Sequence, residues 1–186
     1  MAFSERKVAE MAAYFLLKTE KGIMPHLKLM KLLYLSDREC FRQHGFSMSE
    51  DKMVSMPYGP VLSETLNLIN GVCQSTPNGW DSLISDKENH QVSVDPKVSV
   101  DDLLELSRAE IETMDSVWDK FGSMNQWDIV NYTHNHCPEW EDPEGSSRPI
   151  ELDTLFKALG FSKIQAKALK EQIAEQEAID RIFSGR

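Results

Sequence analysis

The most restrictive feature of the sequence is a segment that is apolar on nearly every side. Residues 27–35 read LKLMKLLYL, in which only two lysines interrupt a run of leucine, methionine and tyrosine. A helix that is hydrophobic all round must be buried, because any exposed side would place apolar surface in water. Pro25 suits the first turn of this helix, and Gly45 suits its end. The sequence therefore predicts a helix that runs through the core.

Around this segment the sequence predicts a mainly α fold, a compact domain of about six to seven helices with a small β hairpin or short strands. Ser4 can cap a first helix, because the apolar residues that follow it have helical spacing. A shorter helix is expected at residues 152–158. Three capping boxes predict later helices: SRAE from Ser107, SMNQ from Ser123 and SKIQ from Ser162.

The β elements are expected between the helices. Residues 52–56 form a predicted strand, SLIS and QVSV flank DKENH as a predicted hairpin, and Pro60 is expected to open a third helix. Residues 1–160 are expected to form the domain. Residues 161–186 are expected to form a C-terminal helix that either packs on this domain or contacts a partner.

The charge distribution bears on the class of partner. Twenty basic and 30 acidic residues give a net charge of −10, and residues 80–119 contain eleven acidic residues against three basic ones. A chain this acidic is repelled by nucleic-acid phosphates, so no direct nucleic-acid binding is expected. The acidic region serves solubility by default, and less often such a region covers a basic surface of a partner.

Cysteine content and hydropathy favour a cytoplasmic location. Three cysteines form an odd and sparse set, unlike the framework of a disulfide-stabilised domain. The most apolar N-terminal stretch, VAEMAAYFLL, contains Glu10 and is too short to span a bilayer. We expect a soluble, reduced, cytoplasmic protein without membrane contact.

The segment THNHCPEW, residues 133–140, gathers two histidines, a cysteine and a glutamate. Zinc sites usually bring their ligands as two paired clusters, and no second cluster is present in the sequence. Cys137 has no helix N-terminus before it to stabilise a thiolate, which a nucleophile needs. The favoured interpretation is a helix end that Pro138 stops, with Trp140 folded back onto the core.

A basic stripe is predicted on the central helix. Lys28, Lys31, Arg38 and Arg42 fall three or four residues apart if Leu35 is counted between them. This stripe suits either an acidic partner or a solvated face, of which the solvated face is the commoner case.

The stretch MPYGPV, residues 56–61, combines two prolines and a glycine around Tyr58. The prolines and the glycine restrict the backbone, and a tyrosine on a rigid loop is a good contact residue because it loses little entropy on binding. The alternative is a plain turn from strand to helix in which Tyr58 packs inward.

These segments resemble a known family. KLMKLLYLSDRECFRQHG followed by MVSMPYGPVLSE is similar to the Panacea domain, also called the SocA-like antitoxin-associated domain. LSRAEIETMDSVWDKFG and the T-H…P-E-W segment match the rest of that pattern, so the resemblance covers about residues 5–160. The last helix lies outside it.

The resemblance implies a helical antitoxin encoded beside a toxin gene, often on mobile elements or prophages, that neutralises its toxin by direct binding. An alternative is a proteolytic adaptor that delivers the toxin to a protease. The family offers no catalytic residue, so we expect no enzymatic activity and no cofactor. A metal-dependent enzyme using His134, His136 and Cys137 is the rival hypothesis. The expected partner is the cognate protein toxin from the adjacent gene, and homo-oligomerisation is left open.

We expect the toxin to contact the surface around the tyrosine turn, the point where the central helix becomes polar, and the end of the last helix. The apolar stripe of that last helix either needs a partner or packs on its own domain. The predicted partner-binding residues are Asp37, Arg38, Pro57, Tyr58, Gly59, Ile182 and Phe183.

Overall fold

A computed structural model of the chain describes residues 3–183. Over these residues the fold contains seven α-helices and two small antiparallel sheets, which confirms the mainly α prediction. The helices are α1 (Glu5–Leu17), α2 (His26–His44), α3 (Ser63–Ile69), α4 (Arg108–Phe121), α5 (Gln126–His136), α6 (Leu152–Ala158) and α7 (Lys163–Phe183). The strands are β1 (Ile23–Pro25), β2 (Met53–Met56), β3 (Gly59–Leu62), β4 (Gln91–Ser93) and β5 (Arg148–Pro149), and two short 3-10 helices span Trp80–Ser82 and Val100–Asp102.

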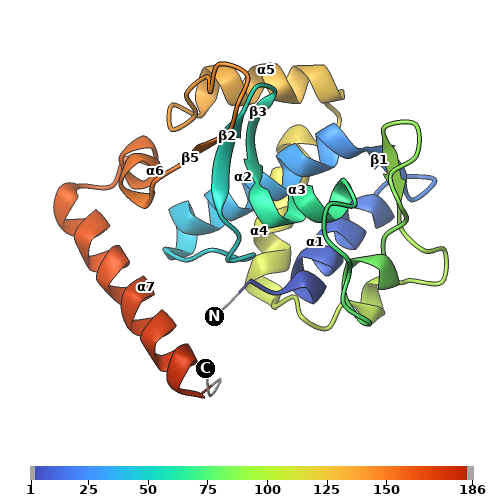
Figure 1. Ribbon diagram of the computed structural model, residues 1–186, viewed down its shortest axis with the longest axis horizontal. Coiled ribbons are helices and arrows are strands. Elements are labelled where there is room, and N and C mark those ends of the chain that lie inside the picture. Colours follow the sequence, from blue (N-terminus) through green and yellow to red (C-terminus); the bar gives the residue numbers. More distant parts are fainter. Residues whose placement is uncertain (1–2, 184–186) are drawn as a thin grey trace.

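Helix α2 runs through the middle of the molecule, as predicted (Figure 1). Its residues 29–37 are all buried, and α1, α4, α5 and strand β3 pack around it. The helix ends at Gly45, whose φ of 78° places it in the left-handed region that glycine adopts easily. Because α2 contacts so many other elements, its polar side chains Lys31, Ser36 and Asp37 lie inside the fold, whereas Arg42, Gln43 and His44 in its last turn are exposed.

The two sheets are small and come from distant parts of the chain. Strands β1 and β4 pair, and β2 pairs on one side with β3 and on the other with β5. The strand at residues 52–56 is confirmed as β2, and SLIS and QVSV do meet, through a bridge between Ile84 and Val94. The further pairing of β4 with β1 was not predicted.

The helix predicted to begin at Pro60 is wrong. Pro60 lies in β3 opposite Ser55, and α3 begins at Ser63. The start of α3 is fixed by Asp51, whose carboxylate accepts hydrogen bonds from the backbone N–H groups of Glu64 and Thr65 at 2.9 and 2.8 Å. This cap comes from a residue before the hairpin, so the sequence next to the helix does not contain it.

Two of the three predicted capping boxes are confirmed. Ser107 and Glu110 form one at the start of α4, and Ser162 and Gln165 exchange the same hydrogen bonds at the start of α7. Ser123 was the wrong cap for α5. The side chain of Asn125 accepts the hydrogen bonds of Trp127 and Asp128 instead, and the helix begins two residues later than expected from Ser123.

Helix α7 extends from α6 along one edge of the molecule (Figure 1). Ala166 is its only buried residue in the described chain, and Leu169 and Ile173 pack partly against the core. The division into residues 1–160 and 161–186 stays a prediction.

Candidate functional site

The turn between β2 and β3 presents an aromatic side chain to solvent. Tyr58 is 60% exposed, and its ring meets that of Trp127 edge to face, with centroids 5.9 Å apart. Trp127 lies in the first turn of α5 and is itself 52% exposed. Of the two interpretations of MPYGPV, the structure therefore has Tyr58 pointing outward, beside a tryptophan that the sequence analysis did not single out. We call Tyr58 and Trp127 the aromatic pair.

Gly59 holds this turn close to the helices beneath it. Its φ is 94°, and a Cβ atom built there would lie 2.7 Å from the Thr133 hydroxyl and 3.1 Å from the Lys31 ammonium. No larger residue fits without displacing one of these groups, so glycine is required both by the backbone angle and by the space. The tip of the hairpin is thus fixed against α2 and α5.

Lys31 anchors the hairpin from inside. Its side chain is wholly buried, and its Nζ donates a 2.7 Å hydrogen bond to the carbonyl of Pro60. Among residues 3–183 no carboxylate lies within ion-pair distance of it. Burial without a counter-charge lowers the pKa of Lys31 to about 7.

The prediction that the basic stripe is a solvated face is wrong for its buried part. Lys31 is inside, and Lys28 donates to the carbonyl of Gly122 at the end of α4, at 2.6 Å. A cation at the C-terminal end of a helix meets unpaired carbonyls and the negative end of the helix dipole. These two lysines therefore join α2 to its neighbours.

Trp140 supports the same hairpin from the other side. Its indole N–H donates to the carbonyl of Met56 at 3.0 Å, and its ring stacks on that of His134 with centroids 4.0 Å apart. Helix α5 ends at His136, before Pro138, so the predicted helix end and the return of Trp140 are confirmed. Trp140 is half-buried in this position.

A buried polar network lies next to these contacts. The Glu139 carboxylate accepts hydrogen bonds from the Tyr34 hydroxyl at 2.6 Å and from the Arg38 guanidinium at 2.5 Å. Tyr34 and Glu139 are almost completely buried, and burial followed by the negative charge of Glu139 raises the pKa of Tyr34. The network ties α2 to the segment after α5. The sequence analysis missed it, since nothing local to Arg38 indicates a partner so far along the chain.

Asp37 and Arg38 differ from their expected role as contact residues. Asp37 is fully buried, and its carboxylate accepts hydrogen bonds from the backbone N–H groups of Met48 and Ser49 at 2.8 and 2.9 Å. It shapes the loop after α2 and does not reach the surface. Arg38 is mostly buried and paired with Glu139, so its guanidinium is engaged within the fold.

The histidine and cysteine cluster does not converge. Among the described residues no group of three or more histidine, cysteine or acidic side chains is placed to hold a metal ion. His134 stacks on Trp140, whereas His136 stacks on Tyr132 on another side of α5. Burial, together with Glu139, raises the pKa of the Cys137 thiol to about 12, so this side chain is a thiol rather than a nucleophilic thiolate at neutral pH.

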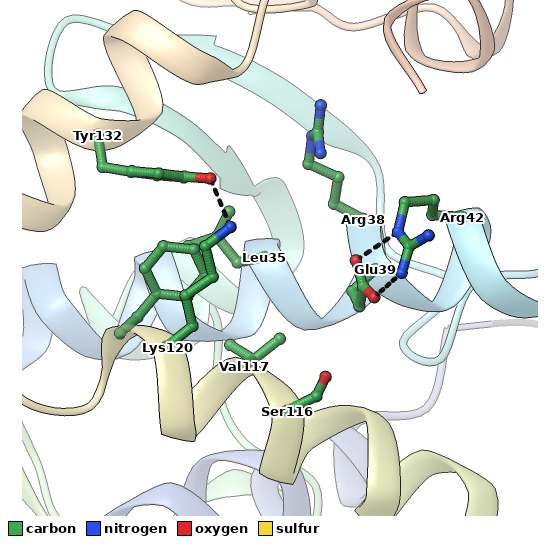
Figure 2. A pocket seen from close by; sticks show the side chains of 9 residues that line it. Leu35, Arg38, Glu39, Arg42, Ser116, Val117, Lys120 and Tyr132 are labelled. Atoms are coloured by element: carbon green, nitrogen blue, oxygen red, sulfur yellow. Dashed lines mark hydrogen bonds and ion pairs between the residues drawn. The ribbon is translucent and has the colours of Figure 1, made fainter. Parts of the chain in front are cut away.

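A hollow of about 310 Å³ opens between α2, α4 and α5 (Figure 2). Its charged side chains are Arg38, Arg42 and Lys120, with Glu39 the one acidic side chain in its lining. Arg42 forms an ion pair with Glu39, and the Lys120 ammonium donates to the Tyr132 hydroxyl at 2.9 Å. We call this feature the basic hollow. It contains the second half of the predicted stripe, of which Arg38 is mostly buried and Arg42 is exposed.

Ile182 and Phe183 lie far from the turn. They are 77% and 87% exposed near the end of α7, at the opposite end of the molecule from the tip of the β2–β3 hairpin (Figure 1). The seven predicted contact residues therefore do not form one surface. Pro57, Tyr58 and Gly59 belong to the turn, Asp37 and Arg38 to the interior, and Ile182 and Phe183 to the end of α7.

The comparisons with known proteins give one match. The family model described as "Antitoxin SocA-like, Panacea domain" matches residues 29–141, which is narrower than the resemblance seen in the sequence. No curated protein and no solved structure matches the chain. The matched region runs from α2 to the residue after Trp140, and so it contains the hairpin, the aromatic pair, the buried network and the basic hollow, but not α7. No helix among residues 3–183 is long and apolar enough to cross a membrane.

Proposed function

The chain belongs to the SocA-like Panacea antitoxin family, and we propose that it neutralises a cognate protein toxin by binding it directly. The family match supports an antitoxin-type role for the chain. The toxin is, on this proposal, the product of the adjacent gene, and the complex forms in the cytoplasm without a cofactor or catalytic step.

The observation that carries the proposal is the exposed aromatic pair. Tyrosine and tryptophan dominate the energetic centres of protein interfaces, because they bury large areas while few rotatable bonds are fixed. Tyr58 and Trp127 are both more than half exposed, and they touch each other although they are far apart in the sequence. Two such rings exposed side by side leave apolar surface in contact with water in the free protein, which is unfavourable. A partner that covers the rings would remove this contact with water.

The support beneath the pair strengthens the case for binding. Lys31 holds the carbonyl of Pro60, and Trp140 holds the carbonyl of Met56, so the backbone on both sides of the turn is fixed. A contact loop that is already ordered loses little entropy when it binds. Pro57, Tyr58 and Gly59 are therefore retained as proposed contact residues, and Trp127 is added to them.

The test is a rescue assay in cells that express the adjacent toxin, with binding of the purified proteins measured in parallel. Tyr58→Ala and Trp127→Ala should each weaken binding by about 1–2 kcal/mol or more and reduce rescue. Phe46→Ala is the matched control, since Phe46 is also an exposed aromatic, at 44%, but lies away from the hairpin in the loop after α2. Full rescue and unchanged affinity in both aromatic variants would refute the proposal, provided that all variants keep the melting temperature of the native chain.

A proteolytic adaptor is the second candidate, and the position of α7 favours it. An adaptor needs one surface for the toxin and a separate one for the protease. The aromatic pair and the exposed Ile182 and Phe183 lie at opposite ends of the molecule (Figure 1). If the chain is an adaptor, the double variant Ile182→Ser and Phe183→Ser should still bind toxin but should no longer shorten the lifetime of the toxin in cells. A toxin lifetime that the native chain leaves unchanged would exclude this candidate.

A further inference from the structure

The basic hollow stands out because the chain as a whole is acidic. Its lining has three cations and one carboxylate, whereas the whole chain has a net charge of −10. The three cations come from two helices that are far apart in the sequence, Arg38 and Arg42 from α2 and Lys120 from α4. Their convergence is a property of the fold and not of any local run of basic residues.

The three cations are not equivalent. Arg38 pairs with the buried carboxylate of Glu139, and Arg42 pairs with Glu39. Lys120 donates only to the neutral hydroxyl of Tyr132, and no carboxylate of residues 3–183 lies within ion-pair distance of its ammonium. The hollow thus presents one positive charge that is not neutralised by a neighbour.

Lys120 is also held in place. Its ammonium lies 5.0 Å from the centre of the Phe121 ring and 5.1 Å from that of Tyr132, in addition to the hydrogen bond to the Tyr132 hydroxyl. These contacts keep the charge at the edge of the hollow instead of letting the side chain extend into water. Leu35 and Val117 add apolar lining beside it (Figure 2).

We propose that the basic hollow receives one aspartate or glutamate side chain of the toxin, whose carboxylate pairs with Lys120 while its methylene groups pack on Leu35 and Val117. This inference rests on the proposed function. A single carboxylate is favoured over a phosphate group, because one un-neutralised cation balances one negative charge but leaves a phosphate dianion in excess.

The hollow lies within reach of the same partner as the aromatic pair. Tyr132, which lines the hollow, follows Trp127 by five residues on α5. This spacing corresponds to about 7–8 Å along a helix axis. An interface of ordinary size is several times wider. Because five residues also turn a helix by about 140°, Trp127 and Tyr132 point to different sides of α5. On this inference the toxin reaches around α5 and contacts the aromatic pair through apolar surface and the hollow through a charge.

The experiment compares the affinity of the native chain, Lys120→Glu and Lys157→Glu for the purified product of the adjacent toxin gene. Lys157 is the matched control, because it too is an exposed lysine in the last turn of a helix, α6, outside the hollow. Lys120→Glu should weaken binding by about tenfold or more, since like charges would then face each other, whereas Lys157→Glu should change it by less than about twofold. Both variants replace exposed side chains and should keep the native melting temperature.

A charge swap then identifies the occupant. Among toxin variants in which single surface aspartates or glutamates are changed to lysine, one should restore binding to Lys120→Glu. Equal affinities of the native chain and Lys120→Glu, or the absence of any restoring variant, would overturn the inference while leaving the proposed function intact. If Tyr58→Ala loses binding and Lys120→Glu does not, the inference is likewise overturned and the proposed function stands. A native chain that binds no toxin would refute the proposed function, and this inference with it.

A separate experiment, on the purified chain without the toxin, tests whether the hollow binds a small anion. Amide NMR spectra are recorded while inorganic phosphate is added at constant ionic strength. Shifts at Val117, Lys120 and Tyr132 should stay negligible. Saturable shifts confined to these residues would mean that the hollow binds a free anion, and the assignment to a toxin carboxylate would be abandoned.

Discussion

Replacing Lys31 with methionine should change how the stability of the protein depends on pH. Lys31 is wholly buried, has no carboxylate within ion-pair distance among the described residues, and makes one hydrogen bond, to the carbonyl of Pro60. Methionine has a similar length and no charge, so Lys31→Met removes the titrating group while filling nearly the same space. The substitution thus isolates the cost of holding an ammonium group inside the core.

The sign of the effect follows from the two pKa values. Burial lowers the pKa of Lys31 from 10.5 to about 7 in the folded protein. Below pH 7 the side chain is charged in both states, and the folded state bears the full cost of the buried charge. Between pH 7 and 10.5 the unfolded chain binds more protons than the folded one, so the free energy of unfolding rises with pH in that interval. The expected rise is about 1.4 kcal/mol per pH unit, or about 4–5 kcal/mol in all.

The assay is urea unfolding of the native chain and of Lys31→Met at several pH values from 6 to about 10. Subtracting one profile of unfolding free energy against pH from the other removes the contributions of the titrating groups that both proteins share. At pH 6 the variant should be the more stable by about 2–4 kcal/mol, after a loss of about 1–3 kcal/mol for the unpaired Pro60 carbonyl. This advantage should shrink as pH rises from 7. Parallel curves, or a variant less stable than the native chain at pH 6, would refute the reasoning that Lys31 is a buried, unpaired cation.

Three further changes test other parts of the site. Gly59→Ala should lower the free energy of unfolding by about 1–3 kcal/mol, measured by urea unfolding, because a Cβ atom there meets Thr133 at 2.7 Å in an unfavourable backbone conformation; an unchanged midpoint would contradict this. Glu139→Gln should cost about 3–5 kcal/mol in the same assay, because the Arg38 guanidinium would lose its carboxylate, and a double variant with Arg38→Met should recover part of the loss. Association with the toxin, followed by stopped flow, should slow as salt rises if the acidic region at residues 80–119 steers a basic surface of the partner; a rate independent of salt would exclude that steering.

The helices could be predicted from the sequence where their signals are local. The all-apolar run of α2, the capping boxes of α4 and α7, and the bounds of α6 all involve residues close together in the chain. Periodicity and caps act over a few residues, so a single sequence contains all that is needed to recognise them. Two starts were wrong, one because the cap is distant in the sequence and one because a local competitor was passed over. Asp51 caps α3 from beyond the hairpin, and Asn125 competes with Ser123 for α5.

The roles of polar residues could not be predicted in the same way, because their partners are distant in sequence. Lys28 reaches a carbonyl 94 positions away and Arg38 a carboxylate 101 positions away. Spacing alone assigns both to one stripe, and a stripe of basic residues usually faces water. The packing of other elements around the buried part of α2 reverses this inference for Lys28, Lys31 and Arg38, whose polar ends meet other parts of the fold, whereas Arg42 in the last turn is exposed.

This reversal also separates scaffold from recognition surface. The buried lysine and the two ends of the Tyr34–Glu139–Arg38 network use the polar atoms of α2 to hold the hairpin and α5 in position, and so these atoms are not available to a partner. The side chains left exposed by that arrangement include Tyr58 on the hairpin, Trp127 on α5 and Lys120 on α4. Substitution in the first group should therefore lower stability or shift its pH dependence. Substitution in the second should lower affinity for the toxin at unchanged stability, and a variant of Tyr58 or Lys120 that unfolds the chain would show that this separation does not hold.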